Sequence, residues 1–459
     1  MKDNVMEVAS MAGRIMLENG AEIARVEEVM SRIATHYGTD SCNFFVLSNG
    51  IFTTDSNHAK VEHIPFHGSQ FDKVVEVCRV SRQVERGQLS IQQCEAKLQA
   101  IRRMNAHPAT EQIFASALGS AGFCAIFGGG IVDCAVSFVC GLLLWIYIIA
   151  LGNRYMSKIT SNIAGGMLVS LLCIVCHHLG IGHLGNIITG AIIPLVPGVP
   201  FTNGIRDLAN EDYIAGATRL LDALMVFLCI AAGVSFAFML DYAVMGEMIH
   251  IDGMHTDPFT STWAFQIVAS LVGTAAFAVL FGVPRRYYID CGLCGMAGWL
   301  TYMVLMRLCG SSVVIATFFA AIVVAVLSYG FAMFRRCPVI VFLVCGIFPL
   351  VPGAGVFWTT YNVVSDQLSS ALTTGFTALK LTFAIVFGII IFMELRNRLK
   401  HTALQIPAIS LQQKTAHPPK VNRPWLSTTP PPHHSYPFIP TIHKPKEKEK
   451  LSYFSNSGS

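Results

Sequence analysis

Five ionisable residues lie inside otherwise apolar stretches of the sequence: Asp133, Arg219, Asp222, Asp290 and Lys380. A charged side chain within a membrane is costly, and it usually faces a bundle interior or a polar path. A carboxylate in such a place can take up and release a proton, and an ammonium group can bind an anion. The three aspartates and Arg219 are therefore candidates for proton coupling, and Lys380 is a candidate ligand for a substrate carboxylate.

Each of these residues also has an ordinary structural interpretation. Asp222 follows Arg219 by three residues, so the two share a helix face and can form a structural ion pair. Asp133 and Asp290 fall in first helical turns, where the helix dipole favours a carboxylate. Lys380 can extend its ammonium group to the membrane edge. The sequence leaves both sets of interpretations open.

A second set of candidates surrounds the segment PLVPG, which occurs at residues 194–198 and again 155 positions later at 349–353. Proline removes a backbone donor and glycine weakens a helix, so each copy predicts a break. Exposed backbone at the breaks, with the polar side chains that follow, suits a small zwitterion carrying a hydroxyl; ordinary loop polarity is the competing interpretation. The predicted substrate-binding residues, besides Lys380, are Pro197, Gly198, Thr202, Asn203, Arg206, Asp207, Pro352, Gly353, Trp358, Thr359, Tyr361 and Asn362.

The composition places these residues in a membrane protein. Of 459 residues, 53% are hydrophobic and only 13% are charged, against roughly 25% charged in soluble domains. A spanning helix needs roughly 20 mostly apolar residues. Windows of this kind predict ten spans, near 111–128, 131–151, 160–180, 185–198, 213–240, 265–283, 288–308, 312–333, 338–352 and 368–395.

The distribution of Lys and Arg predicts the orientation of these spans. If the polar N-terminal region is cytoplasmic, the loops on its side carry seven of these residues and the opposite loops carry only Arg307, as the positive-inside rule requires. The seven are Arg154, Lys158, Arg206, Arg285, Arg286, Arg335 and Arg336. The opening residues MKDNVMEVAS show no signal peptide. We therefore expect both termini in the cytoplasm.

The two halves of the apolar region resemble each other. IFASALGSAGFCAIFG at 113–128 aligns with IVASLVGTAAFAVLFG at 267–282, and an Asp-Cys pair follows each, at Asp133 and at Asp290. Together with PLVPG, these landmarks predict a duplicated unit of five helices. Because five is odd, the second unit must be inverted, and in such proteins paired broken helices meet near the midplane and line a polar cavity. The competing interpretation is that Pro and Gly merely kink membrane helices.

The predicted architecture is an all-α polytopic membrane protein with a small N-terminal α+β cytoplasmic domain. Two amphipathic helices within 6–34, a hairpin at 43–54, and helices at 69–86 and 91–104 make up that domain, the last helix opened by a capping box. The proline-rich C-terminal segment predicts disorder. The expected divisions are 1–108, the first five-helix repeat 109–240, an extracytoplasmic connection 241–263, the second repeat 264–397, and the tail 398–459.

Three segments resemble a known family: NGAEIARVEEVM at 19–30, PLVPGVPFTNGIRDLANEDYIAG at 194–216 and PLVPGAGVFWTTYNVVSDQL at 349–368. They are similar to the threonine/serine exporters of the bacterial inner membrane. The second half resembles the companion subunit that some members encode separately. The resemblance covers roughly residues 6–397, and it implies secondary-active export of threonine and serine, driven by the membrane potential or a proton gradient. Split members are associated with succinate, so a dicarboxylate exporter is the alternative.

An intramembrane enzyme is a more remote alternative, because two membrane aspartates can share a proton and activate water. The G-x-G-D signature of intramembrane aspartyl proteases is missing from the sequence, and the internal repeat favours transport. We therefore expect no enzymatic activity, no cofactor and no metal. The expected partners are a small-molecule substrate, protons and the lipid bilayer, without nucleic acid, and a homo-oligomer is left open.

Overall fold

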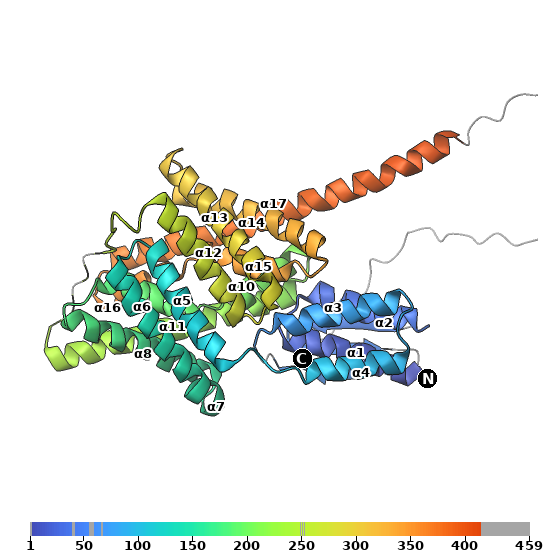
Figure 1. Cartoon of the computed structure of the whole chain (residues 1–459), viewed down its shortest axis with the longest axis horizontal. Coiled ribbons are helices and arrows are strands. Elements are labelled where there is room, and N and C mark those ends of the chain that lie inside the picture. The colour runs from blue at the N-terminus through green and yellow to red at the C-terminus, as the bar shows by residue number, and fades with distance from the viewer. Residues whose placement is uncertain are drawn as a thin grey trace, which may run out of the picture. The chain divides into compact units, whose positions relative to one another are not determined.

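The computed structural model describes residues 2–38, 42–54, 59–65, 68–247, 249, 251 and 253–414 (Figure 1). Residues 1–400 form one compact unit that includes both the N-terminal domain and the membrane helices. Most of the predicted disordered tail, residues 415–459, lies outside the described residues.

The N-terminal domain, called the head below, combines four helices with three strands, as an α+β domain should. The capping box at Ser90 and Gln93 is confirmed, because the Ser90 side chain accepts from the Gln93 backbone and the Gln93 side chain accepts from the Ser90 backbone. The elements are α1 (Lys2–Glu18), α2 (Ile23–His36), β1 (Asn43–Leu47), β2 (Gly50–Thr54), β3 (Ala59–His63), α3 (Phe71–Glu85) and α4 (Ile91–Arg102).

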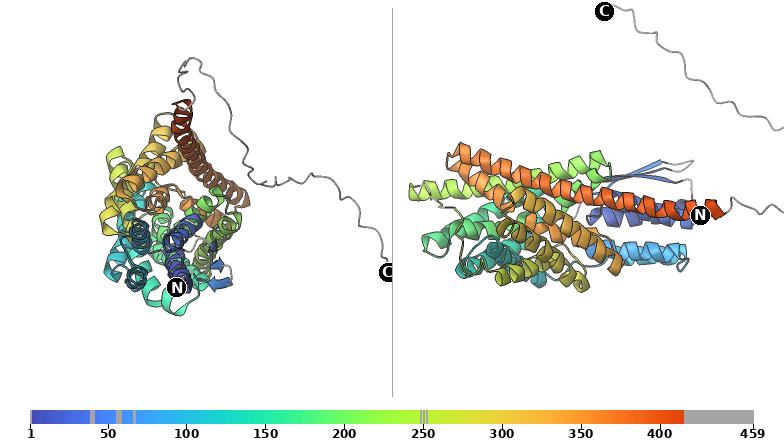
Figure 2. Two further views of the ribbon diagram at one scale, coloured as in Figure 1. Left: turned by 90° about the vertical axis from the view of Figure 1, so that its right-hand side faces the viewer. Right: turned by 90° about the horizontal axis from the view of Figure 1, so that it is seen from above.

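The predicted hairpin is confirmed and carries a third antiparallel strand, in the order β1-β2-β3. Val46 and Ile51 pair across the first two strands, and both side chains are buried. The helices of the head lie along one side of the sheet (Figure 2). Strand β3, with the sequence AKVEH, is exposed along most of its length. Its apolar residues Ala59 and Val61 are both exposed, so β3 contributes no apolar face to the core.

The rest of the compact unit is helical. Its first half contains α5 (Ala109–Ile126), α6 (Ile131–Tyr147), η1 (Ile148–Gly152), α7 (Asn153–Tyr155), α8 (Lys158–His178), α9 (Leu184–Ile192), η2 (Ile193–Leu195), α10 (Gly198–Ala209) and α11 (Tyr213–Met245). Its second half contains α12 (Trp263–Leu280), η3 (Arg285–Tyr287), α13 (Tyr288–Arg307), α14 (Val313–Arg335), α15 (Ile340–Ile347), η4 (Phe348–Leu350), α16 (Gly353–Val364) and α17 (Leu368–Lys414), which continues into the segment predicted as tail.

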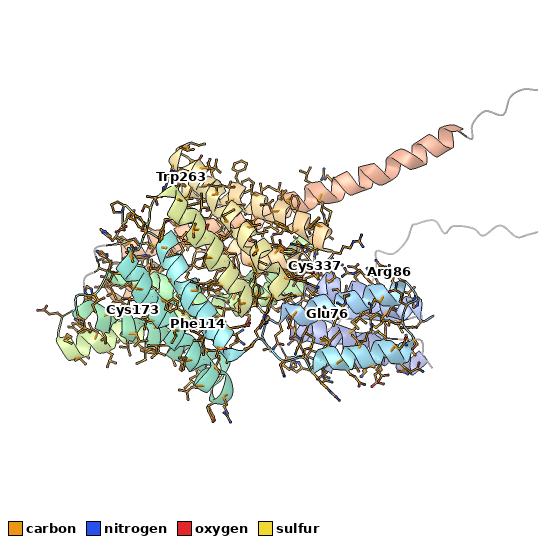
Figure 3. The ribbon with its side chains drawn as sticks, viewed as in Figure 1. Glu76, Arg86, Phe114, Cys173, Trp263 and Cys337 are labelled. Atoms are coloured by element: carbon orange, nitrogen blue, oxygen red, sulfur yellow. The ribbon has the colours of Figure 1, made fainter. Side chains whose placement is uncertain are left out.

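Within the described residues, seven helices are long and apolar enough to cross a membrane, and counting each of two bent pairs as one span gives up to nine. The remaining predicted span corresponds to α5, whose first turn carries the polar residues Thr110, Glu111 and Gln112. Large apolar side chains on these helices are exposed, as lipid-facing side chains are. Phe114 on α5 is one example, and Trp263 at the start of α12 lies beneath Arg307 (Figure 3).

Helices α5 and α12 pack against each other in opposite directions. The end of α5 meets the segment before α12, where the Asp257 backbone N–H donates to the Gly128 carbonyl at 3.0 Å. The contact is also reciprocal. Gly119 on α5 lies under the ring of Phe277, and Gly273 on α12 lies under the ring of Phe123. On each helix the phenylalanine follows the glycine by four residues. Such an exchange of equivalent partners is typical of an approximate two-fold relation.

A Gln–Trp hydrogen bond occurs at the equivalent place in both halves. The Trp145 indole N–H donates to the Gln112 side chain at 3.2 Å, and the Trp299 indole N–H donates to the Gln266 side chain at 2.8 Å. Both glutamines lie near the start of the first helix of their half, and both tryptophans lie 33 residues later. The two halves therefore share side-chain contacts as well as helix order.

Candidate functional site

Both PLVPG segments break a helix in the same way. The α9–α10 pair bends by 63° and the α15–α16 pair by 46°. At each bend a short 3-10 turn with a proline in its first positions replaces the α-helical pattern. The Gly198 N–H then donates to the Val196 carbonyl at 2.8 Å, and the Gly353 N–H donates to the Val351 carbonyl at 2.7 Å. The prolines thus lack the helical donor, and the tight turn satisfies a neighbouring carbonyl.

The segments after the breaks differ from the predicted loops. They form helices α10 and α16, each of 12 residues. Each helix is followed by an acidic residue with a left-handed backbone, Glu211 (φ 69°) and Asp366 (φ 57°). These two residues are again 155 positions apart, so the second half repeats the first without insertion or deletion in this region.

The two breaks touch each other. A β-carbon placed on Gly198 would lie 2.5 Å from the Phe348 ring, and one placed on Gly353 would lie 3.0 Å from Ile193. Phe348 stands 155 positions after Ile193, so each glycine contacts the equivalent residue of the other break. A side chain at Gly198 would force Phe348 to move, whereas one at Gly353 would require only a small shift of Ile193.

The junction between the breaks is apolar. The ring of Phe348 lies 4.2 Å from that of Phe277 and 5.6 Å from that of Phe123, measured between centroids. Both Phe348 and Ile193 are buried. The structure therefore differs from the predicted polar cavity between the broken helices: aromatic side chains fill the junction, and the cavities lie beside it.

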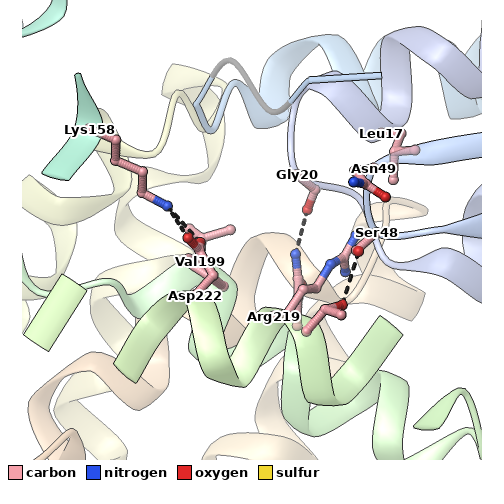
Figure 4. A pocket seen from close by; sticks show the side chains of 11 residues that line it. Leu17, Gly20, Ser48, Asn49, Lys158, Val199, Arg219 and Asp222 are labelled. Carbon is pink, nitrogen blue, oxygen red and sulfur yellow. Dashed lines mark hydrogen bonds and ion pairs between the residues drawn. The ribbon is translucent and has the colours of Figure 1, made fainter. Parts of the chain in front are cut away.

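One cavity lies between the first break and the head, with a volume of about 310 Å³; we call it the head-side cavity. Lys158 from α8 reaches across it and donates to both carboxylate oxygens of Asp222 on α11, at 2.5 and 2.6 Å (Figure 4). Ser48 of the head accepts from Thr218 on its other side at 2.9 Å. The membrane part contributes seven lining residues: Lys158, Val199, Pro200, Asn203, Thr218, Arg219 and Asp222.

A second cavity of about 290 Å³ lies beside the second break, and none of the described head residues lines it; we call it the distal cavity. Its lining includes Val313, Ala354, Gly355, Trp358, Thr373, Thr374 and Thr377. Each of these seven follows one of the seven membrane residues of the head-side cavity by 155 positions. The two cavities are therefore equivalent places in the two halves.

Equivalent residues in the two cavities also carry polar atoms without a partner. Among the described residues, neither the Asn203 side-chain oxygen nor the Trp358 indole N–H has a hydrogen-bond partner, although both atoms are buried. Asn203 stands at the head-side cavity where Trp358 stands at the distal one. A buried polar atom without a partner costs about 1–3 kcal/mol, and each of these two residues lines its cavity.

Four of the predicted binding and coupling residues instead hold the head to the membrane helices. Asn203 donates to the Gly20 carbonyl at 2.8 Å. Asp207 accepts from the Ile23 backbone at 3.3 Å and from Arg219 at 2.8 Å, and Arg219 also donates to the Ala21 carbonyl at 3.0 Å. Arg206 forms an ion pair with Glu22, in which the guanidinium nitrogen lies 2.5 Å from the carboxylate oxygen. The contacting head loop is residues 19–22.

Arg219 and Asp222, which the sequence allowed to pair, do not pair with each other. Arg219 is paired with Asp207, whereas Asp222 is paired with Lys158 and is about half exposed. The two charges share one helix face, but each meets an opposite charge from another element. The two ion pairs differ in burial. In the Arg219–Asp207 pair the Arg219 side chain is only 10% exposed and Asp207 is fully buried.

The other charged candidates lie apart from the two cavities. Asp133 is buried and accepts from the Gly130 backbone at 2.8 Å and from the His183 backbone at 2.6 Å, so it caps the start of α6 and contacts the start of α9. Asp290 is held by two hydrogen bonds from Arg335, at 2.8 and 3.0 Å. Lys380 is exposed and lines neither cavity.

The remaining polar candidates serve the breaks themselves. The Thr359 hydroxyl donates to the Gly355 carbonyl at 2.7 Å and lies 3.2 Å from the hydroxyl of Thr374. Tyr361 donates to the Ile249 carbonyl at 3.1 Å. Thr202 and Asn362 are buried beside them. Pro197 and Pro352 occupy the turns, where their backbone carbonyls begin α10 and α16.

Sequence reasoning missed Lys158 and the threonines Thr373, Thr374 and Thr377. Lys158 was interpreted only as a positive-inside loop residue, although it begins α8 just as Val313 begins α14. The 155-residue spacing of the PLVPG segments also aligns Lys158 with Val313, and it aligns Thr218, Arg219 and Asp222 with Thr373, Thr374 and Thr377. Applying it to these helices would have marked both sets as equivalent positions.

The fold and the site define a multi-pass membrane transport protein with two broken helices and a cavity beside each. Sequence comparison agrees: the threonine/serine exporter family matches residues 7–241, and a second sequence model, described as "Threonine/Serine exporter, ThrE", matches residues 266–394. The first match alone covers more than half of the chain. The protein belongs to the threonine/serine exporter family.

Named relatives include the "Threonine/serine exporter" of Corynebacterium glutamicum, 22% identical over 417 residues that cover 86% of this chain and 83% of that protein. The "Probable threonine/serine exporter" of Mycobacterium tuberculosis is 21% identical, covering 88% and 78%. The "Pheromone-regulated membrane protein 10" of Pichia sorbitophila is 23% identical over a shorter match, which covers 49% of this chain and 24% of that protein. No solved structure matches.

Proposed function

We propose that this protein is a secondary-active exporter of threonine and serine, driven by the proton-motive force, in a bacterial cell (inner) membrane with both termini cytoplasmic. The observation that carries the proposal is the equivalence of the two cavities, each lined by the same seven positions of its half. An inverted repeat supplies such a pair when one half rocks against the other around a shared junction. The relatives' names support the choice of substrate.

The junction of the breaks is the proposed centre of movement. Gly198 and Gly353 permit the two bends to approach closely, and the apolar rings between them form no hydrogen bonds that a rocking motion would have to break. The cavities on either side can then widen in turn. We keep the ten-span, five-plus-five inverted arrangement as part of this proposal, with α5 as the first span.

Asp133 is our candidate for proton coupling. It is buried, yet its carboxylate lies 3.2 Å from the Nδ1 atom of His183, whose side chain is about half exposed. The His183 ring is stacked on that of His255 at 4.1 Å. Because His183 immediately precedes α9, a proton that changes this contact would act on the first broken helix. Asp290 and Arg219 each have a committed ion-pair partner, so we assign them structural roles.

The test is efflux from vesicles reconstituted with the full-length protein and loaded with threonine, serine or succinate. We expect efflux of both hydroxy amino acids to rise when a proton gradient is imposed and to fall when a protonophore removes it. The Asp133→Asn variant should keep exchange across the membrane and lose the response to the gradient. Efflux of succinate alone would overturn the proposal in favour of the dicarboxylate alternative.

A further inference from the structure

We propose that the head-side cavity binds the substrate as a zwitterion, with Lys158 holding the α-carboxylate and Asp222 holding the α-ammonium group. The inference rests on the proposed function and assigns its site. It begins from the ion pair that crosses the cavity, in which the Lys158 ammonium group lies 2.5 Å from Asp222. These two groups are the complements of the two charges that every free amino acid carries.

The ion pair is suited to exchange for a ligand. The side chains of Lys158 and Asp222 are 50% and 43% exposed, and a pair this exposed contributes little to stability. Opening it to admit a zwitterion therefore costs little, and both charges regain a partner. The remaining charged residue of the lining, Arg219, is committed to Asp207 and to the Ala21 carbonyl.

The neutral lining accounts for a hydroxyl on the ligand. The Asn203 side-chain oxygen is buried and has no partner among the described residues, while its amide nitrogen is fixed on Gly20. Because Asn203 lines the cavity, we assign this oxygen to the hydroxyl of the bound ligand. Sites that leave a buried polar atom unpaired discriminate strongly against ligands that lack the matching group.

The size of the cavity favours a small ligand. Its volume of about 310 Å³ lies at the lower end of the usual range of roughly 300–1,000 Å³ for ligand pockets. Thr218 and Ser48 close one side with a shared hydrogen bond of 2.9 Å (Figure 4). A dicarboxylate would place its second carboxylate toward Asp222, where like charges repel.

The distal cavity is the neutral counterpart. Val313 and Thr377 stand where Lys158 and Asp222 stand, and none of its lining residues is charged. It offers the unpaired indole N–H of Trp358 and the hydroxyls of its threonines. A zwitterion would therefore be held more weakly there, which favours release after transport.

The test is equilibrium binding of labelled threonine to the purified full-length protein in lipid nanodiscs. Threonine methyl ester, which lacks the carboxylate, and N-acetylthreonine, which lacks the ammonium group, serve as competing probes. We expect Lys158→Met and Asp222→Asn each to bind threonine at least tenfold more weakly. The Lys158→Met variant should no longer prefer threonine over its methyl ester, and Asp222→Asn should no longer prefer threonine over N-acetylthreonine.

The matched control is the Glu111→Gln, Arg285→Met double variant, which removes another exposed ion pair outside both cavities. It should bind threonine as the unmodified protein does. Suppose that the reconstituted protein exports threonine and that both cavity variants bind threonine as the unmodified protein does. That result would overturn the zwitterion site and leave the exporter proposal standing. Unmodified protein that exports succinate and does not bind threonine would overturn both.

Discussion

Gly198 in one broken helix lies against the ring of Phe348 in the other, and 155 positions later Gly353 lies against Ile193. The exchange of equivalent partners ties the two bends into one junction. A side chain at either glycine would have to displace the opposite break.

We therefore expect Gly198→Ala to impair export strongly, because its new β-carbon would lie 2.5 Å from Phe348. Overpacking of this kind costs about 1–3 kcal/mol. Efflux from loaded vesicles should fall at least tenfold, and Phe348→Leu in the same protein should restore part of it. Gly330→Ala is the matched control, since a β-carbon there meets no atom within 4 Å. Equal efflux from both glycine variants would contradict a moving junction.

The ion pair between Glu22 and Arg206 should stabilise the attachment of the head. Their side chains are only 7% and 5% exposed, and removing one partner of a buried pair costs about 3–5 kcal/mol. We expect Glu22→Gln to lower the thermal unfolding temperature of the detergent-solubilised protein. Adding Arg206→Met should recover part of the loss. Glu394→Gln, which breaks an exposed pair with Arg398, should change little; a similar loss in both single variants would argue against this interface.

The repeated Gln–Trp hydrogen bond permits a comparison within one molecule. Gln266 is buried and also donates to the Ala125 and Thr260 carbonyls, whereas Gln112 is only partly buried. Gln266→Met should therefore reduce the free energy of unfolding by about 1–3 kcal/mol, and Gln112→Met by less. Denaturant unfolding followed by tryptophan fluorescence measures both. The reverse order would show that burial does not set the strength of these bonds.

Thiol labelling tests the orientation. Cys309 is exposed in the loop between α13 and α14, on the side predicted to face outward. A membrane-impermeant maleimide should label it in intact cells, as read by peptide mass spectrometry. In the head, burial raises the pKa values of Cys78 and Cys94 to about 11, so near neutral pH both stay protonated and slow to react even after permeabilisation. Labelling of Cys309 only after permeabilisation would reverse the topology.

Most of the helices and the repeated break could be predicted from the sequence, because apolar run length, proline and glycine act locally. The three-stranded sheet was only partly predictable, since β3 is short and its apolar residues are exposed, without a buried face. Which charges pair could not be predicted. Arg219 is close to Asp222 along the helix, yet it binds Asp207 from α10, and that choice depends on how helices pack.

The contact between the head and the membrane helices could not be predicted for the same reason. The segment NGAE at 19–22 and the segment NGIRD at 203–207 are far apart in the sequence, and each resembles the family separately. Only the fold shows that Gly20 and Glu22 contact Asn203 and Arg206. A local pattern identifies such segments, but it does not tell which of them meet.

The head contacts only one of the two equivalent cavities. Two identical halves related by a two-fold axis would have the same cavity opening on both sides of the membrane. Such a pair would not distinguish the side of substrate entry from the side of release. The loop at residues 19–22 and the side chains that differ between the halves remove that ambiguity. Under the proposed inverted arrangement, the polarity of this protein is an addition to a symmetric scaffold, and it can be altered without rebuilding the scaffold.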